Sequence, residues 1–238
     1  MSKDTDTGAP AVTQNVILFF FFLGGTGKST ACANIAVIRQ KRLLAHGGNG
    51  LLQVLDTDKQ ATLNDWNDTR DLAGIQPHIN VVQKIDSEVK PTVDYWLKSA
   101  GVNDLLIDAG GRDNKGLRSA MLCATKMITP IQASQFDLWT LEKLQEMHSD
   151  VKSFNPGLQI YILINRASTH VFDKDAENAR DFAKDYPEFT LMETVLHDRA
   201  IYRRAASTGL SVVEMPNAAP KAKSEIMSLY EEIFNDDI

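Results

Sequence analysis

The stretch from Val16 to Thr30, VILFFFFLGGTGKST, constrains the fold more than any other part of the chain. Its apolar first half is typical of a buried strand, and the residues after it are typical of a helix. Between them, glycines let main-chain N–H groups turn toward a phosphate, and the helix start favours negative charge. Lys28 suits the β- and γ-phosphates, and Ser29 suits Mg²⁺. This order predicts a nucleotide-binding loop rather than a glycine turn without a ligand, with the phosphates held by Gly24, Gly25, Thr26, Gly27, Lys28, Ser29 and Thr30.

Length and charge narrow the class of protein. The 238 residues suit one α/β domain. The formal net charge of −6 provides no overall attraction to nucleic acid, so contact with DNA requires a local basic patch. The longest apolar run is shorter than the roughly 20 residues of a membrane helix and lacks a preceding basic segment. Cys32 and Cys123 have neither zinc-site nor disulfide spacing and are predicted to be core residues. We expect a cytoplasmic protein that binds no membrane.

The chain alternates predicted strands and helices. Residues 1–14 are small and polar and are predicted to be a flexible tail, too short for a helix-turn-helix module, before a single domain of residues 15–238. The alternation predicts an α/β fold with a mostly parallel sheet covered by helices on both faces. Predicted strands lie at 16–23, 51–56, 79–85, 105–107, 126–132, 158–166 and 189–192, and predicted helices at 31–44, 61–74, 92–100, 138–153, 173–185, 200–207 and 221–234.

Acidic residues follow two of the predicted strands, at the edge of a parallel sheet where ligands bind. Asp56 and Asp58 end one strand. Asp108 ends another, before Ala-Gly-Gly, and this segment resembles a Walker B motif, whose carboxylate holds Mg²⁺. An aspartate at a strand end can instead cap a turn. Next to a phosphate loop, the magnesium role of Asp108 is the stronger prediction.

The loop resembles the deviant form K-G-G-x-G-K-[ST]-[ST] of the ParA and MinD family of P-loop ATPases, although Leu23 replaces the signature lysine and Phe22 replaces the first glycine of the strict pattern. The resemblance covers most of the chain and is closest to the small ParA plasmid-partition proteins, and it implies a P-loop NTPase fold. The further matching segments are DTDKQ (56–60), TPIQASQFDLWTL (129–141), LINR (163–166) and VLHDRAIYRRAASTGLSVVEM (195–215).

The resemblance implies a role for each matching residue and the cofactors ATP and Mg²⁺. Lys28 and Asp58 would be catalytic, Asp58 by positioning the attacking water. Asp56 would support Mg²⁺ together with Ser29 and Asp108. An amide can pair with both a donor and an acceptor on the adenine edge, so the base-binding candidates are Asn165, Arg166, Met215 and Pro216.

The same resemblance implies partners. These are a second copy of the chain on ATP binding, a ParB-like adaptor that stimulates hydrolysis, and non-specific DNA, with a nucleoid-associated location. DNA binding of this kind depends on neutralising phosphates and weakens with salt. An ordinary solvated helix face is the competing interpretation of the basic residues. Those predicted to contact DNA are Arg199, Arg203, Arg204, Lys221 and Lys223.

Three explanations are open for the presence of Leu23 in place of the signature lysine. The family's lysine reaches the partner's nucleotide across the dimer, and such a charge-assisted hydrogen bond contributes roughly 1.5–3 kcal/mol. Another lysine can substitute in trans, with Lys126 and Lys152 as candidates. The protein can bind ATP and hydrolyse it weakly or not at all. The stretch can also have been altered from a parent sequence.

Three other functions compete with partition. A MinD-like positioning ATPase requires a basic amphipathic C-terminal helix, whereas SEIMSLYEEIFNDDI is acidic. A ligase that activates a carboxylate with ATP is disfavoured by the ParA-like C-terminal third. A nucleotide-sensing module is compatible with Leu23. An iron–sulfur relative is disfavoured by the placement of the cysteines, and the tryptophans predicted to pack rather than to bind bases are Trp66, Trp96 and Trp139.

Overall fold

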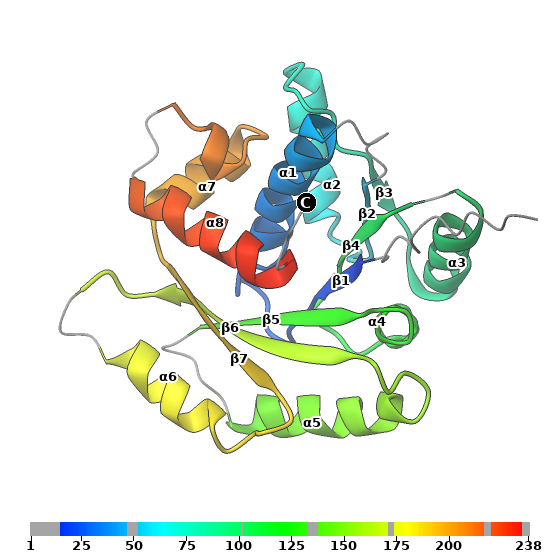
Figure 1. Cartoon of the computed structure of the whole chain (residues 1–238), viewed down its shortest axis with the longest axis vertical. Coiled ribbons are helices and arrows are strands. Elements are labelled where there is room, and N and C mark those ends of the chain that lie inside the picture. The colour runs from blue at the N-terminus through cyan, green and yellow to red at the C-terminus, as the bar shows by residue number, and fades with distance from the viewer. Residues whose placement is uncertain are drawn as a thin grey trace, which may run out of the picture.

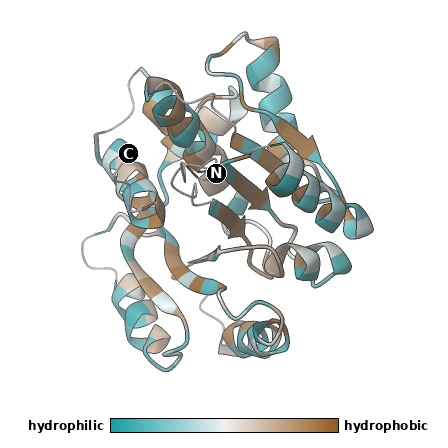
Figure 2. Ribbon diagram, turned by 45° about the vertical axis from the view of Figure 1, so that its right-hand side comes forward, coloured by the Kyte–Doolittle hydropathy of each residue, from teal (hydrophilic) through white to brown (hydrophobic). Residues whose placement is uncertain are grey.

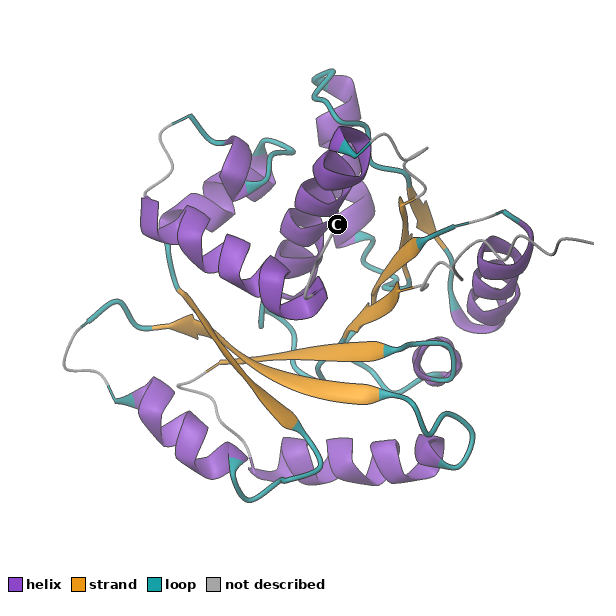
Figure 3. Cartoon of the chain, in the orientation of Figure 1, coloured by secondary structure: helices purple, strands orange, loops and turns teal. Residues whose placement is uncertain are grey.

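The computed structural model of the chain describes residues 15–46, 52–100, 102–132, 138–170, 174–216 and 220–234, with the main chain alone at 138, 139 and 175. A seven-stranded sheet in the order β3-β2-β4-β1-β5-β6-β7 forms its centre, and its paired strands run parallel (Figures 1 and 3). The strands are β1 (Asn15–Phe19), β2 (Leu52–Asp56), β3 (Val81–Gln83), β4 (Asp104–Asp108), β5 (Lys126–Gln132), β6 (Gln159–Ala167) and β7 (Thr190–His197).

Helices cover both faces of the sheet, as the sequence predicts. In Figure 1, α1, α7 and α8 lie on one side, and α5 and α6 lie on the other. The helices are α1 (Lys28–Ala45), α2 (Thr62–Leu72), α3 (Val89–Ser99), α4 (Lys115–Met121), α5 (Leu138–Lys152), α6 (Asp175–Ala183), α7 (Ala200–Ser207) and α8 (Pro220–Phe234), with short 3-10 turns at Asp86–Glu88 and Val212–Glu214.

Two hydrophobic cores lie on the two faces, because successive side chains of a strand point to opposite sides. On β1, Val16 and Leu18 face the core beneath α3, α4, α5 and α6. Ile17 and Phe19 face the core beneath α1, α2 and α8. The central strands are almost entirely hydrophobic in Figure 2, as expected for a parallel sheet buried on both faces. The predicted α/β architecture with one domain is confirmed.

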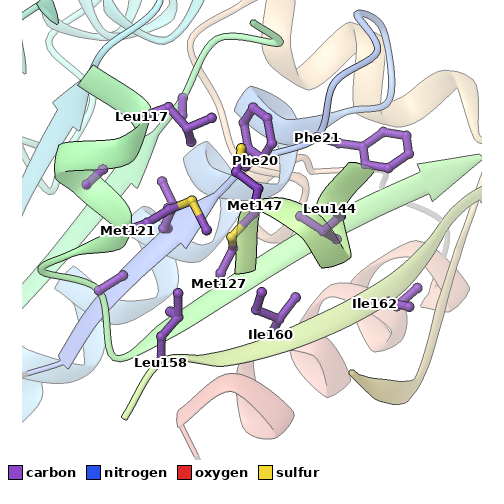
Figure 4. Packing of buried hydrophobic residues seen from close by; sticks show 14 of the residues in the cluster. Phe20, Phe21, Leu117, Met121, Met127, Leu144, Met147, Leu158, Ile160 and Ile162 are labelled. Atoms are coloured by element: carbon purple, nitrogen blue, oxygen red, sulfur yellow. The ribbon is translucent and has the colours of Figure 1, made fainter. Parts of the chain in front are cut away.

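The aromatic run extends beyond the strand. The sequence predicts a strand to Leu23, but β1 ends at Phe19, so this boundary was wrong. Phe20 and Phe21 are buried among Leu117 of α4 and Leu144 of α5 (Figure 4). Their apolar side chains therefore anchor the start of the phosphate loop in the core rather than continuing the sheet.

Other boundaries also differ from prediction. Helix α4 was not predicted, and β7 is longer than the expected strand at 189–192. The predicted tail, residues 1–14, lies outside the described residues. Cys32 is a buried free cysteine and Cys123 is half-buried, as expected for packing residues. Among the described residues, no helix has the length and apolar character needed to cross a membrane.

Candidate functional site

The phosphate loop joins β1 to the start of α1. Gly27 immediately precedes the helix with φ of 91°. A side chain at this position would be strained, and a Cβ atom would lie 2.3 Å from Nδ2 of Asn165. Only glycine fits both conditions. The loop thus brings main-chain N–H groups and the N-terminus of an 18-residue helix to one place, which is an arrangement suited to an anion.

Lys28 points back into this loop. Its Nζ donates a hydrogen bond to the main-chain oxygen of Leu23 at 3.2 Å, and Thr26 Oγ1 donates to the same oxygen at 3.4 Å. Burial lowers the pKa of Lys28, whereas the charges of Asp108 and Asp58 act in the opposite direction. The ammonium group is therefore held inside the loop, where the charges of Asp108 at the end of β4 and of Asp58 in the loop after β2 act on it.

Asp108 is the acidic group best suited to Mg²⁺. It is buried, and its Oδ1 has no hydrogen-bond partner among the described residues. Burial raises the pKa of Asp108 to about 7, and a hydrogen bond from the Ser29 hydroxyl acts against this rise. A buried carboxylate oxygen without a partner is costly unless a cation or donor satisfies it. Carboxylate and hydroxyl oxygens are the ligands that Mg²⁺ prefers, so Asp108 and Ser29 fit the ion.

Asp56 lies beside Asp108 in the sheet register but makes different contacts. Its Oδ1 accepts a hydrogen bond from the Asp58 N–H at 2.9 Å. Its Oδ2 accepts from the N–H groups of Leu63 and Asn64, both at 3.1 Å. Burial raises the pKa of Asp56, and these hydrogen bonds oppose the rise. Asp56 therefore holds the loop at Asp58 and the start of α2 by hydrogen bonds. Its predicted magnesium role stays a prediction.

A cavity of about 810 Å³ opens between the phosphate loop and the loops that follow β2 and β4. Asp58 lines it, and its carboxyl group lies against Gly110, where a Cβ atom would be 3.1 Å from Cγ of Asp58. The predicted catalytic aspartate thus shares the cavity wall with Lys28, and its charge acts on both Lys28 and Asp108. The predicted phosphate and magnesium residues on the cavity wall are Gly24, Gly25, Gly27, Lys28, Ser29 and Thr30.

A second cavity of about 140 Å³ lies on the other side of the phosphate loop. Asn165 and Arg166 line it, as predicted for the base, but their side chains also hold the loop. Asn165 Nδ2 donates to the main-chain oxygen of Thr26, and its Oδ1 accepts from the N–H of Arg166. Arg166 donates to the main-chain oxygen of Gly25 at 2.8 Å. Base recognition by Asn165 stays a prediction. It requires the side-chain amide to give up its hydrogen bonds to Thr26 and Arg166 in favour of the base.

Met215 and Pro216 do not line either of these cavities. Met215 packs against Ala205 and Val212 instead, and Pro216 is exposed. The structure thus does not bring the two predicted base-flanking residues to the site. The 3-10 turn at Val212–Glu214 explains the difference, because it keeps the chain against α7.

The five predicted DNA-binding residues separate into two groups. Arg199 is mostly buried in an ion pair with Glu225 at 2.6 Å, and it lines the second cavity. Arg203 is exposed but bonded to Asp198 at 2.7 Å. No ion pair is made with the described part of the chain by Arg204, Lys221 or Lys223. Arg199 therefore lies in the interior of the site, and the surface candidates reduce to the other four.

Several wall residues were not predicted from the sequence. Arg112 and Asn114 line the larger cavity, and Tyr202 and Ile226 line the smaller one. Arg112 directly follows the double glycine after Asp108. This position in the sequence is the feature from which its place on the cavity wall could have been predicted. The two lysines proposed to replace the signature lysine lie elsewhere. Lys126 bonds to the main-chain oxygen of Ile233 at the amino end of β5, and Lys152 ends α5.

Trp66 and Trp96 pack as predicted. Trp66 is buried and donates to the main-chain oxygen of Leu210 at 3.3 Å. Trp96 packs against the core beneath α3. The side chain of Trp139 lies outside the described residues.

Comparison with known proteins gives one relative and many similar structures. No protein-family model matches the chain. The maintenance of carboxysome distribution protein A of Halothiobacillus neapolitanus is 22% identical over 211 residues, which cover 88% of this chain and 92% of that protein. A plasmid partition protein of Borrelia burgdorferi bound to AMPPNP has a TM-score of 0.65 at 17% identity, covering 94% of this chain and 98% of its own.

The septum site-determining protein MinD of Pyrococcus horikoshii, complexed with Mg-ADP, has a TM-score of 0.67 at 19% identity, covering 93% of this chain and 96% of its own. These structures share the fold of this chain. The relative matches its sequence along nearly the whole length. In this chain the Gly24–Thr30 segment leads from β1 into α1, and Asp108 ends β4 beside β1. Together, these findings show that the chain has the fold of these partition and MinD structures and resembles the relative in sequence along most of its length.

Proposed function

We propose that this protein is a ParA-like ATPase that binds ATP with Mg²⁺ and hydrolyses it to ADP and phosphate. The observation that carries the proposal is the cavity at the phosphate loop, which Lys28 and Ser29 line, with the unpartnered Oδ1 of Asp108 buried on the residue that hydrogen-bonds to Ser29. A lysine, a hydroxyl and a buried carboxylate at a helix N-terminus match the needs of a triphosphate with its metal ion.

Each polar group at or beneath the cavity wall has a distinct task in this proposal. Lys28 leaves the oxygen of Leu23 and binds the β- and γ-phosphates. Ser29 and Asp108 hold Mg²⁺, which supplies neutralisation of the phosphate charge when bound. Asp58 orients the attacking water. Phosphoryl transfer needs mainly such positioning and electrostatic stabilisation. Asp56 acts indirectly, because its contact with the N–H of Asp58 fixes the loop that carries the catalytic carboxylate.

The cellular role that we propose is positioning of a large cargo. ATP binding would produce a homodimer, the dimer would bind non-specific DNA on the nucleoid, and a ParB-like adaptor would release it by stimulating hydrolysis. The names of the relative and of the Borrelia structure, which refer to carboxysome distribution and plasmid partition, support this role. They suggest two kinds of cargo, an organelle-like assembly and a plasmid.

The proposed DNA surface consists of Arg203, Arg204, Lys221 and Lys223, on α7 and the start of α8. Arg203 contributes less than its neighbours, because its charge is already paired with Asp198. Since the whole chain carries a formal net charge of −6, the contact must be local and sensitive to salt.

A membrane-cycling role is a weaker proposal because of α8. The apolar residues of this helix are buried against β7 and α1 and are not available to a bilayer. They are Ile226, Leu229, Tyr230, Ile233 and Phe234. A nucleotide-binding protein with weak hydrolysis remains the second candidate, since Leu23 carries neither charge nor donor.

Binding to duplex DNA of unrelated sequence tests the proposal. The protein is titrated with ATP, ADP or no nucleotide across a salt series, and hydrolysis is followed in parallel. We expect binding only with ATP, weakening steeply as salt rises. Arg204→Ala should weaken binding, whereas Lys98→Ala, which removes an exposed charge on α3, should not. ATP binding without DNA binding would refute the partition cycle and favour the second candidate.

A further inference from the structure

The larger cavity has three cationic residues on its wall, and they differ in what already binds them. Lys28 is turned into the phosphate loop. Lys59 lies 3.6 Å from Asp86. Arg112 is exposed and makes no hydrogen bond, ion pair or ring contact with any described residue. Arg112 is thus the cation of this wall that is available to a ligand without breaking an existing contact.

The main chain fixes where Arg112 begins. A Cβ atom on Gly111 would lie 2.7 Å from the main-chain oxygen of Phe22, so the loop after β4 is packed directly against the phosphate loop. Arg112 follows Gly111 and therefore lies near Leu23, which is uncharged and 36% exposed. Leu23, at the neighbouring position on the phosphate loop, carries no positive charge, whereas Arg112 carries one.

Nearby carboxylates do not neutralise Arg112. Asp113 is the next residue, but both of its oxygens accept from Arg118, at 3.0 Å each. Asp86 lies near Lys59. Asp58 is within the same cavity but forms no ion pair with Arg112 in the described structure. An uncompensated guanidinium consequently stands at the wall of a cavity suited to polyphosphate.

We propose that Arg112 binds the terminal phosphate group of the nucleoside triphosphate held by the same chain. This inference rests on the proposed function. A guanidinium group donates two parallel hydrogen bonds to phosphate oxygens and keeps its charge at any physiological pH. The side chain would therefore distinguish a triphosphate from a diphosphate, and it would hold the γ-phosphate in line with the water oriented by Asp58.

Nucleotide affinity of the purified full-length protein tests this role without depending on hydrolysis. Wild type, Arg112→Ala and Arg112→Lys are titrated with AMPPNP and with ADP, each with Mg²⁺. We expect Arg112→Ala to lose about 10- to 100-fold in affinity for AMPPNP and less than about threefold for ADP, as for one charge-assisted contact. Arg112→Lys should retain part of the preference for AMPPNP over ADP, because lysine keeps the positive charge but cannot donate the two parallel hydrogen bonds of a guanidinium group.

Two controls keep the outcomes distinct. Lys98→Ala removes an exposed positive charge that does not line the cavity, and this variant should bind both nucleotides as wild type does. Arg112→Ala should melt at the wild-type temperature without nucleotide, since the side chain has no partner in the described structure. An unchanged AMPPNP-to-ADP ratio, or equal losses for both nucleotides, would overturn the role of Arg112 alone. Failure of wild type to bind either nucleotide would overturn the proposed function as well.

Discussion

The two strand-end aspartates should respond in opposite ways to the loss of their charge. Asp56 and Asp108 are adjacent in the sheet and equally buried. The carboxylate of Asp56 accepts three main-chain hydrogen bonds, whereas Oδ1 of Asp108 has no partner in the described structure. The carboxylate of Asp56 therefore stabilises the fold, whereas burial of the unpartnered carboxylate of Asp108 lowers the stability of the fold.

The contacts set the expected magnitudes. Asp56→Ala leaves the buried N–H of Leu63 and the part-buried N–H of Asn64 without an acceptor, and each such loss costs about 1–3 kcal/mol. We expect a total loss of about 3–5 kcal/mol in the free energy of unfolding. Asp108→Asn removes a buried charge without taking an acceptor from a main-chain N–H group in the described structure, so stability should be unchanged or higher by about 1–3 kcal/mol.

Urea unfolding without nucleotide and with EDTA measures the free energy of unfolding of each variant. The affinity for AMPPNP with and without Mg²⁺ measures whether the variant still responds to the metal ion. Asp108→Asn should lose most of the enhancement of affinity by Mg²⁺. Asp56→Asn, the milder variant for the binding assay, should keep it. Loss of the magnesium effect in Asp56→Asn with its retention in Asp108→Asn would refute the assignment. So would a loss of several kcal/mol in stability for Asp108→Asn.

Three further predictions follow from single contacts. Burial opposes ionisation of Glu214, but hydrogen bonds from Arg70, the Ser211 N–H and Lys41 lower its pKa. Its stabilisation is therefore present above about pH 4.5 and lost as pH falls below that, and Glu214→Gln should flatten the acid part of a stability–pH curve. Gly111→Ala should weaken AMPPNP binding at least tenfold, since its Cβ must displace the oxygen of Phe22, whereas Gly157→Ala, with nothing closer than 3.8 Å, should not. Leu23→Lys should raise hydrolysis about tenfold or more at high protein concentration, measured as phosphate release; no change would show that this position is not limiting.

Much of the fold could be predicted because its signals are local. The apolar strands, the alternation with helices and the glycine loop each lie within short segments, and together they specify a parallel sheet with ligands at one edge. For this reason Lys28, Ser29 and Asp58 could be expected at one edge of the sheet, where they line the cavity, with Asp108 buried next to Ser29; their roles stay predictions. Each follows a strand or starts a helix, so its position depends on few residues.

The residues that were misplaced depend on contacts between distant segments. Arg199 has the pattern of a surface cation, but it is paired with Glu225, 26 residues away. Met215 follows a turn closed by the Ser211–Glu214 capping box, and Arg70 holds this turn from α2 through Glu214. Charge spacing along one helix contains no information about such partners. Arg112 was missed for the opposite reason, because the significance of a free cation appears only when the neighbouring charges are seen to be paired.

Leu23 affects the side chain that the phosphate loop exposes at this position more than it affects the main-chain contacts of the loop. The contacts that this residue makes to Lys28 and Thr26 use its main-chain oxygen, which any side chain would provide. Phe20 and Phe21 anchor the preceding segment in the core, and Lys143 lies 4.6 Å above the ring of Phe22. None of these contacts needs a lysine at position 23. The loop can thus keep its shape without a charged side chain at position 23, and in the proposed function nucleotide binding and dimer-dependent hydrolysis become separable.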